Sequence, residues 1–396
     1  MPADRRTRLI AFPGQMDGVF FRNELPYLKE EFDEVIVFAY PGNEDECREL
    51  ARVFELEYHI VPMFGISAFF RSLPRLLLDK TVRNEAKGKN PKQLGYMLLY
   101  LVWADMVERV YCDELISDKP TVLYSFWLSR GAYAACRLKF KFGLGKAVSR
   151  AHRYDLYEEQ NAANYLPFRR FLSNSLDEIH FISDDGMRYF AERWGDGSAS
   201  LMISHLGTRP FDYVKKVRPK DLICIASCSA VIDVKRLDLI VDVLEKIDLP
   251  VFWVHIGDGD KKSEIEEYAS SKLRPGSFEF LGHVDNGELA SVFEKYDVDF
   301  FVNLSDSEGI PVSIMEAMSM GVPAIARNVG GNGEIVCDAA GGLLLDEVDA
   351  YAVRVYLNQR FSLDAYEQLS KRARKAWGAA FFAQDCYPSF FKQLSR

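Results

Sequence analysis

The stretch of sequence that decides the fold reads Asn303-Leu-Ser-Asp-Ser-Glu308-Gly-Ile-Pro311-Val-Ser-Ile-Met-Glu316-Ala-Met-Ser-Met-Gly321-Val-Pro323. The β-branched and aromatic run that leads into it, residues 298–303, predicts a strand. A loop and a short helix follow, because Pro311 suits the first turn of a helix and Gly321 with Pro323 ends one. The stretch therefore predicts a strand, a loop and a helix in succession, as in an α/β fold.

Two glutamates stand at the two ends of this loop and helix. Glu308 falls at the exit of the strand and Glu316 well along the helix. Eight residues of helix rise about 12 Å, which is comparable with the separation of sugar and ribose across a diphosphate. The free N–H groups of the first turn, near Gly309 and Ile310, are suited to face an anion. The pair thus indicates a site for both ends of a nucleotide sugar, with a solvated helix face as the alternative.

The same segment resembles the Glu-x7-Glu signature of glycosyltransferase family 4. The agreeing flanking residues are Gly309, Pro311, Ala317, Met318, Gly321 and Pro323, and residues 329–336 match the next loop of the family. The resemblance implies a GT-B fold and a metal-independent hexosyltransferase that retains the anomeric configuration. It also implies that the nucleotide diphosphate sugar, UDP- or GDP-linked, is a substrate and that no cofactor is needed. Glu308 is then expected to contact hydroxyls of the donor sugar, and Glu316 to hold the ribose.

Residues 280–284 resemble the family segment that grips the base through backbone groups. This segment contains Gly282 and His283. We therefore expect Gly282 and the backbone of His283 to lie at the base, and we take the His283 side chain as an ordinary loop residue.

Residues 223–240 resemble the first strand and helix of the family's nucleotide-binding domain, in which a lysine and an earlier arginine neutralise the departing diphosphate. Lys235 fits the lysine, whereas Ser229 or Ala230 stands where the arginine is expected. Arg236 is a candidate for the second cation, because a leaving group needs donors near the phosphates rather than at a fixed sequence offset. The alternative for Arg236 is a solvated start of a helix.

In the first half of the chain, residues 148–159 follow a predicted strand. His152 resembles the histidine that lies beside the donor sugar in the family, which implies a role in positioning that sugar or relaying a proton. Arg150 is a candidate phosphate contact, with an ion pair to Asp155 as the alternative. Gly14 lies in the predicted loop after the first strand, where the family has a glycine-rich phosphate loop, so we expect it near the diphosphate or the acceptor.

Short apolar runs alternate with helix-length amphipathic segments through nearly the whole chain, which is typical of parallel sheets with crossover helices. The predicted strands are residues 9–12, 35–40, 122–126, 146–150, 178–182, 222–226, 251–256, 277–281, 298–303 and 324–326. They fall into two series, which predict two doubly wound Rossmann-like domains facing a central cleft, a natural ligand site for such sheets. The predicted domains are residues 1–206 on the acceptor side and 207–376 for the nucleotide sugar, with a helix at 377–396 that crosses back.

Composition narrows the class of protein and its compartment. The net charge is −9 and the pI about 5.4, which argues against a nucleic-acid partner. The seven cysteines are scattered, which favours a reducing compartment. Residues 9–12 are too short for a signal-peptide core. The most apolar stretch, residues 96–103, is closed by Asp105 and Glu108, which predicts an amphipathic helix rather than a membrane span. A cytoplasmic location is therefore expected.

One segment of the first half is basic although the protein is acidic. Residues 67–92 contain seven cations, Arg71, Arg75, Lys80, Arg83, Lys87, Lys89 and Lys92, against two acids, Asp79 and Glu85. Interleaved leucines and phenylalanines give the segment an apolar side, a combination typical of helices that rest on anionic lipid. We therefore expect a lipid-linked saccharide acceptor, or an oligosaccharide derived from one, and attachment to the inner face of the cell membrane. The alternative is a solvated helix whose leucines pack on the N-terminal sheet.

The sequence also allows other classes of protein to be compared with a GT-B glycosyltransferase. Asp297 and Asp299 form the D-x-D string of a metal-dependent GT-A enzyme, but they precede a strand instead of following one, so no metal site is predicted. The chain lacks the G-x-G-x-x-G of a nicotinamide dehydrogenase. A catalytically silent GT-B module that binds a nucleotide sugar or a partner, and a GT-B nucleotide-sugar epimerase, remain as alternatives.

Overall fold

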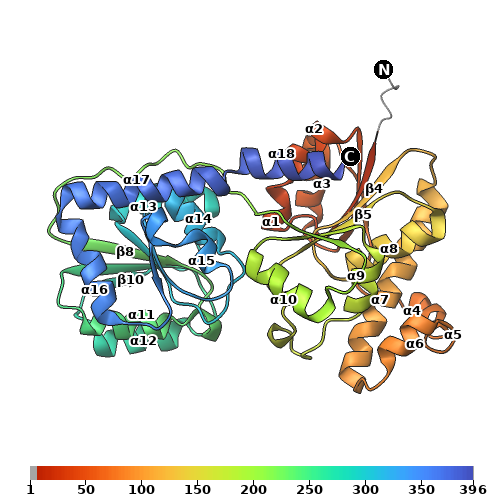
Figure 1. The fold of residues 1–396 in the computed structure, drawn as a ribbon, viewed down its shortest axis with the longest axis horizontal. Helices are drawn as coiled ribbons and strands as arrows, with labels where there is room; N and C mark the ends of the chain where they lie inside the picture. Colours follow the sequence, from red (N-terminus) through yellow and green to blue (C-terminus); the bar gives the residue numbers. More distant parts are fainter. Residues whose placement is uncertain (1–6, 396) are drawn as a thin grey trace. The chain divides into compact units, whose positions relative to one another are not determined.

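A computed structural model describes residues 7–395 and divides the chain into two compact units. The first unit runs up to Ser204 and also contains the end of the chain from Tyr387, and the second runs from His205 to Cys386. The sequence predicts these boundaries at 206/207 and 376/377. Each unit is built on one parallel sheet with helices on its faces (Figure 1).

The sheet of the first unit has the strand order β3-β2-β1-β4-β5-β6-β7. Its strands are β1 (Arg8–Gln15), β2 (Glu34–Tyr40), β3 (Glu57–Ile60), β4 (Thr121–Ser125), β5 (Ala147–Ala151), β6 (Glu178–Phe181) and β7 (Ser200–Ile203). Its helices are α1 (Val19–Arg22), α2 (Leu25–Glu31), α3 (Glu44–Val53), α4 (Ile66–Ser72), α5 (Arg75–Leu78), α6 (Lys80–Ala86), α7 (Pro91–Val110), α8 (Arg130–Phe142), α9 (Arg169–Ser175) and α10 (Asp184–Trp194).

Alternate side chains of the strands build the core of this unit. Ile10 and Phe12 of β1 point to the face that is covered by α7 and α8, where Trp103 lies edge-on to Phe12. The other face carries Tyr124 of β4, whose ring meets Phe390 near the end of the chain. The central strands are thus buried on both sides, as expected for a parallel sheet.

The sheet of the second unit has the order β10-β9-β8-β11-β12-β13. Its strands are β8 (Ile223–Cys228), β9 (Val251–Ile256), β10 (Phe278–Phe280), β11 (Phe300–Asn303), β12 (Ala324–Arg327) and β13 (Leu343–Leu345). Its helices are α11 (Leu237–Lys246), α12 (Lys262–Lys272), α13 (Leu289–Tyr296), α14 (Val312–Ser319), α15 (Asn332–Ile335), α16 (Ala350–Asn358) and α17 (Leu363–Ala380). The last helix, α18 (Ala383–Leu394), belongs to the first unit from Tyr387 onward.

Strand β8 shows how this second sheet is covered. Ile223 and Ile225 face the core under α11 and α16, whereas Cys224 and Ala226 face the core under α13, α14 and α17. Figure 1 shows α13, α14 and α17 on one side of this sheet and α11 and α12 on the other. Two doubly wound Rossmann-like units are therefore confirmed.

All of the predicted strands are present, and three strands that the sequence does not predict are added. These are β3, β7 and β13, each of them at an edge of its sheet. The helix predicted at residues 96–103 is also longer than expected. Asp105 and Glu108 do not end it, because both are buried within α7 and are paired with cations of neighbouring helices. Within residues 7–395, no helix combines the length and the apolar character needed to cross a bilayer.

Candidate functional site

The decisive stretch forms a loop between β11 and α14. Pro311 precedes the helix instead of occupying its first turn, and its carbonyl accepts from the N–H of Ile314 at 3.1 Å. Gly321 ends the helical segment at a φ of +77°, a value that favours glycine. The segment from Glu308 to Glu316 is thus helical only from Val312 onward, so the rise of eight helical residues does not describe the separation of the two glutamates.

Glu308 and Lys235 are brought together. The Glu308 carboxylate, 6% exposed, accepts from Lys235 Nζ at 2.7 Å and from Asn303 Nδ2 at 3.1 Å. Lys235 ends a 3-10 turn that follows β8, and Asn303 is the last residue of β11. A carboxylate, a cation and an amide are therefore held at the ends of two neighbouring parallel strands, where such sheets bind ligands. The sequence places Asn303 in the motif but does not assign it this contact.

The loop after Glu308 presents free backbone donors. Gly309 and Ile310 are buried, and their N–H groups have no hydrogen-bond partner within residues 7–395. The loop is fixed from the other side, because the Gly309 carbonyl accepts from the N–H of Gly331 at 2.7 Å. Gly330 lies so close that a Cβ there would come within 1.9 Å of the Glu308 carbonyl oxygen. Two unpaired donors before a helix, next in the chain to a lysine-bound carboxylate, suit an anion.

Glu316 lies on α14 in a different environment from that of Glu308. It is buried, and it accepts from Asn286 Nδ2 at 2.6 Å. Burial raises the pKa of Glu316 to about 7, and the Asn286 hydrogen bond opposes that shift. Asn286 belongs to a polar turn after β10 for which the sequence offers no functional signal. Within residues 7–395, Glu316 therefore has no cationic partner, and it changes its charge near neutral pH.

The predicted base-binding segment is joined to the neighbouring strand end. Gly282 has a φ of +73°, and its carbonyl accepts from the N–H of Gly257 at 2.8 Å. The His283 side chain is exposed and lies 3.5 Å from Asp285. The exposed position agrees with the interpretation of His283 as an ordinary loop residue. Backbone groups are then the contacts that residues 280–284 can make with a base.

Arg236 is not drawn into the Glu308 cluster. Its guanidinium donates to Asp238 at 2.9 Å and to Asp306 at 3.1 Å, and it lines a cavity of about 570 Å³ beside the 3-10 turn. No contact within the described residues joins it to Lys235 or Glu308. The structure therefore gives Arg236 two carboxylate partners, and the phosphate contact expected from the sequence stays a prediction.

His152 lies in the first unit, directly after β5. Its ring stacks on Phe126 and lies tilted against Trp127, with both ring centroids 4.5 Å away, and the residue is 6% exposed. Both ring nitrogens are buried without a hydrogen-bond partner in the described part of the chain. Burial lowers the pKa of His152 well below its usual value, so the ring is neutral. A neutral imidazole with two unused nitrogens is suited to a hydroxyl-bearing ligand.

Arg150 corrects a prediction. It contacts neither a phosphate site nor Asp155, because its guanidinium is fully buried and donates to Glu24 at 2.6 Å. The Phe390 ring of α18 covers it at 4.0 Å. Asp155 accepts instead from the backbone N–H groups of His152 and Leu128. Arg150 therefore holds the fold together at the point where α18 packs on the first unit.

Gly14 lies inside β1 rather than in a loop after it. The strand continues to Gln15, with an irregularity between Ala11 and Gly14, where φ is +86°. Gly14 borders a cavity of about 500 Å³ whose wall is rich in aromatic residues. Its large side chains are Tyr40, Met63, Tyr96, Tyr100, Trp127, Arg130 and Tyr154. This cavity of the first unit is a candidate site for a ligand with apolar faces.

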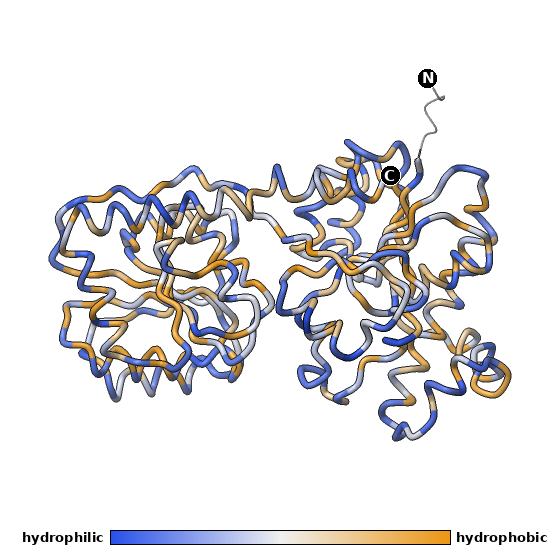
Figure 2. Tube along the Cα trace, in the orientation of Figure 1, coloured by the Kyte–Doolittle hydropathy of each residue, from blue (hydrophilic) through white to orange (hydrophobic). Residues whose placement is uncertain are grey.

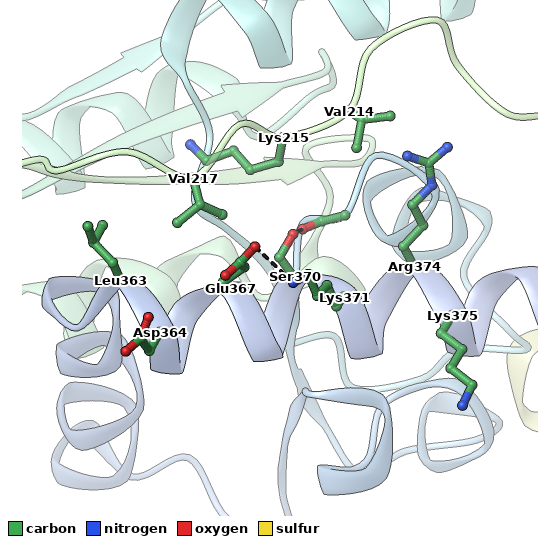
Figure 3. A pocket seen from close by; sticks show the side chains of 11 residues that line it. Val214, Lys215, Val217, Leu363, Asp364, Glu367, Ser370, Lys371, Arg374 and Lys375 are labelled. Carbon is green, nitrogen blue, oxygen red and sulfur yellow. Dashed lines mark hydrogen bonds and ion pairs between the residues drawn. The ribbon is translucent and has the colours of Figure 1, made fainter.

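The D-x-D string is structural, as its position before β11 predicts. The Asp299 carboxylate is fully buried and pairs with Arg360 at 2.6 Å, Lys215 at 2.8 Å and Lys220 at 2.9 Å. A cavity of about 720 Å³ near this cluster contains none of the predicted site residues (Figure 3). Figure 3 shows Lys371 of α17 paired with Glu367 at 2.8 Å on its wall. No group of three or more potential metal ligands occurs within residues 7–395.

Comparison with known proteins assigns the fold. Residues 209–376, less than half of the chain, match the family model described as glycosyl transferases group 1. The structure is similar to the solved structure of Anabaena HepE in complex with UDP-glucose, with a TM-score of 0.68 and 14% sequence identity. The similarity covers 97% of this chain and 98% of the HepE chain. The fold is GT-B. The comparisons thus support the broader group 1 of glycosyltransferases, and membership of family 4 itself stays a prediction.

Curated relatives are similar to part of the chain. An uncharacterized glycosyltransferase of Methanocaldococcus jannaschii is 36% identical over 113 residues, 28% of this chain and 31% of the relative. The O-antigen biosynthesis glycosyltransferase WbnH of Escherichia coli is 29% identical over 160 residues, 40% of this chain and 43% of the relative. The match therefore spans less than half the length of these relatives, and it supports a group 1 glycosyltransferase with the GT-B fold.

Proposed function

We propose that the protein is a retaining, metal-independent glycosyltransferase. It transfers a sugar from a UDP- or GDP-linked donor to a saccharide or lipid-linked saccharide in cell-surface polysaccharide synthesis. The observation that carries this proposal is the Lys235–Glu308 pair at 2.7 Å beside the unpaired N–H groups of Gly309 and Ile310. The UDP-glucose bound by HepE and the O-antigen role of WbnH are consistent with this donor class and this product class.

The second unit would bind the donor. Lys235 and the N–H groups of Gly309 and Ile310 would stabilise the negative charge that develops on the departing diphosphate. Glu308, oriented by Lys235 and Asn303, would accept hydrogen bonds from hydroxyls of the donor sugar. These protein donors supply the positive charge for which other glycosyltransferases use a divalent cation, and this is the basis for proposing metal independence.

The remaining predicted residues complete the binding of the donor and the handling of protons. Glu316 would accept from the ribose hydroxyls, and backbone groups at Gly282 would contact the base. The neutral His152 ring has two unpaired nitrogens, one of which can donate while the other accepts. We propose that it binds a sugar hydroxyl and relays a proton.

A panel of nucleotide sugars tests the proposal. One donor should raise the melting temperature, since a ligand at a hundred times its Kd adds roughly 2.7 kcal/mol of stability. With acceptor, that donor should release its nucleoside diphosphate, and NMR of the product should show the anomeric configuration of the donor. EDTA should change the rate little. An inverted product, or activity that is lost with EDTA and restored by manganese, would contradict the mechanism.

A silent nucleotide-sugar-binding module is the second candidate. It is favoured by one observation, namely that the Arg236 guanidinium, the candidate to replace the arginine missing at Ser229 or Ala230, donates to Asp238 and Asp306. A donor that stabilises the protein but is neither hydrolysed nor transferred would support this candidate. Conversion of a nucleotide sugar without any acceptor would point to the epimerase.

A further inference from the structure

The first unit exposes an unusual cluster of apolar side chains. Six large apolar residues between positions 63 and 78 are from 48% to 81% exposed, and they lie on α4, on α5 and in the turn before α4. They are Met63, Phe64, Ile66, Phe70, Leu77 and Leu78. Figure 2 colours the trace along α5 largely as hydrophobic. Apolar groups gathered in this way on a surface mark a site of interaction.

These six side chains do not pack into the core of their own unit, because α4 and α5 are already anchored to it by other residues. Arg71 and Arg75 tie α4 and α5 to α7, because Arg71 Nη2 lies 2.8 Å from Asp105 and Arg75 Nη2 lies 3.7 Å from Glu108. Ala68 and Ser72 of α4 are buried underneath. Leu76 does pack on the core of the N-terminal sheet, whereas Leu77 and Leu78 point outward. The helices are therefore anchored on one side and leave the apolar cluster free on the other.

The same region keeps an excess of positive charge. After Arg71 and Arg75 are neutralised by α7, five cations have no carboxylate within 4.0 Å in the described part of the chain: Lys80, Arg83, Lys87, Lys89 and Lys92. The two nearby acids are engaged with neutral groups. Asp79 caps α6, and Glu85 accepts from the Tyr165 hydroxyl and the N–H of Phe168. The region is thus basic in a protein whose net charge is −9.

We propose that this α4–α6 surface, the six apolar side chains with the five unpaired cations, docks on an anionic lipid bilayer. Exposed apolar groups would enter the boundary between headgroups and acyl chains, while the cations would face the anionic headgroups. Each basic residue strengthens such binding roughly fivefold. Charge argues against a second copy of the chain as the occupant, because a symmetric dimer would set five cations against five others.

This surface adjoins the cavity of the first unit. Met63 belongs to the exposed cluster and also lines the cavity that contains Trp127 and Tyr154. If the proposed transferase function holds, a bilayer on the α4–α6 surface brings the mouth of that cavity to the membrane. The acceptor is then an amphiphile whose sugar lies among the aromatic rings and whose lipid stays in the bilayer.

Vesicle flotation tests the docking. The full-length protein should float with vesicles of phosphatidylcholine and phosphatidylglycerol, should not float with phosphatidylcholine alone, and should be released by high salt. Combined Lys80→Glu, Arg83→Glu and Lys87→Glu should weaken binding on the order of a hundredfold. Leu77→Ser with Leu78→Ser should weaken it roughly tenfold.

Matched controls lie on α16 and α17 of the second unit. Lys371→Glu, Arg374→Glu and Lys375→Glu reverse exposed cations, and Tyr351→Ser with Val355→Ser removes exposed apolar groups. Neither control should change flotation, and circular dichroism confirms that each variant folds. Equal binding to both vesicle types, or to neither, would overturn the proposal. A dimer that the Leu77 and Leu78 changes dissociate, without vesicle binding, would reassign the surface to self-association.

The acceptor step has a separate readout. The α4–α6 variants should lower kcat/KM only for an acceptor embedded in anionic vesicles, and should leave donor binding and transfer to a water-soluble saccharide unchanged. Equal loss with both acceptors would contradict the membrane role while leaving the transferase function standing. Absence of any transfer by the wild-type protein would refute the transferase function and leave the flotation result to be judged alone.

Discussion

Two of the cation–carboxylate pairs have nearly equal lengths but lie in very different surroundings. Arg150 and Glu24 of the first unit meet at 2.6 Å with both side chains fully buried, and Lys235 and Glu308 of the second unit meet at 2.7 Å with the lysine 22% exposed. The first pair is closed off by the Phe390 ring and by the Tyr124 hydroxyl, which donates to Glu24. The second stands beside backbone donors that have no hydrogen-bond partner in the part of the chain that the structure describes.

The difference shows that the surroundings of an ion pair, rather than its length, decide whether a ligand can reach it. Burial raises the pKa of Glu24 to about 7, and the Arg150 charge offsets only part of that desolvation. A ligand cannot reach it. At the second pair a ligand can share Lys235 with Glu308 and use the N–H groups of Gly309 and Ile310.

The largest expected effect is on turnover in Glu308→Gln. The amide keeps the shape of the side chain but loses the charge that orients Lys235, and contacts made in the transition state appear in kcat. We expect kcat to fall roughly a hundredfold to a thousandfold, with donor affinity changed far less. Steady-state kinetics at saturating donor measures this, with Glu294→Gln on α13 as the surface control. Turnover equal to that of the wild type would remove Glu308 from the mechanism.

Changes to the buried Arg150–Glu24 pair should lower the stability of the protein and leave catalysis unchanged. Arg150→Met leaves Glu24 buried without a cation, which is expected to cost about 3–5 kcal/mol in the free energy of unfolding. Glu24→Leu added to Arg150→Met should recover most of that loss, because no buried charge is then left uncompensated. Urea unfolding measures both variants. If the folded fraction of Arg150→Met instead had a higher KM for the donor, that result would support the phosphate contact predicted from the sequence.

Glu316 is a third buried carboxylate, and it has an amide in place of a cation. Its pKa of about 7 in the folded protein lies above the ordinary value of 4.5, so folding is favoured with the proton bound. That contribution is complete below about pH 4.5 and is lost as the pH rises through about 7. Glu316→Gln should therefore stabilise the unliganded protein by about 2 kcal/mol more at pH 8 than at pH 5. Denaturant unfolding at both pH values measures this, and an equal gain at both would show that Glu316 is not protonated near neutrality.

The smallest expected effect is that of Asn286→Leu. Its amide hydrogen bond lowers the pKa of Glu316, so its loss should raise that pKa further. Since an ionised carboxylate accepts more strongly than a carboxylic acid, donor binding at pH 7 should weaken a few-fold, and the deficit should shrink by pH 9. Calorimetric titration of donor across this range measures it, with Asn328→Leu as a surface control. A pH profile identical to that of the wild type would leave Asn286 without a positioning role.

The residues around Glu308 could be placed at the ends of strands from the sequence because they lie in short, ordered segments. The stretch that contains Glu308 and Glu316 carries its own strand, loop and helix, and Lys235 follows the strand next to it. Arg150 was assigned wrongly because its partner, Glu24, is 126 residues away and Phe390 comes from the end of the chain. No local pattern records such a contact.

The contacts of Asn286 and the cavity around Trp127 escaped prediction for related reasons. Asn286 lies in a polar turn like many others, and only the packing of α14 turns Glu316 toward it. The cavity collects residues from distant parts of the first unit, among them Gly14, Met63 and Trp127. Nothing in the sequence around each of these residues indicates that they line the same cavity.

The strands at the sheet borders determine how the protein avoids sticking to other chains. In each sheet the outermost strands are only three or four residues long, namely β3 and β7 in the first unit and β10 and β13 in the second. A long uncovered border strand would offer a row of unpaired backbone groups to any unfolded or neighbouring polypeptide. Glu57 and His59 further place polar groups on β3. The brevity of these strands thus protects both sheets from strand-by-strand growth into aggregates.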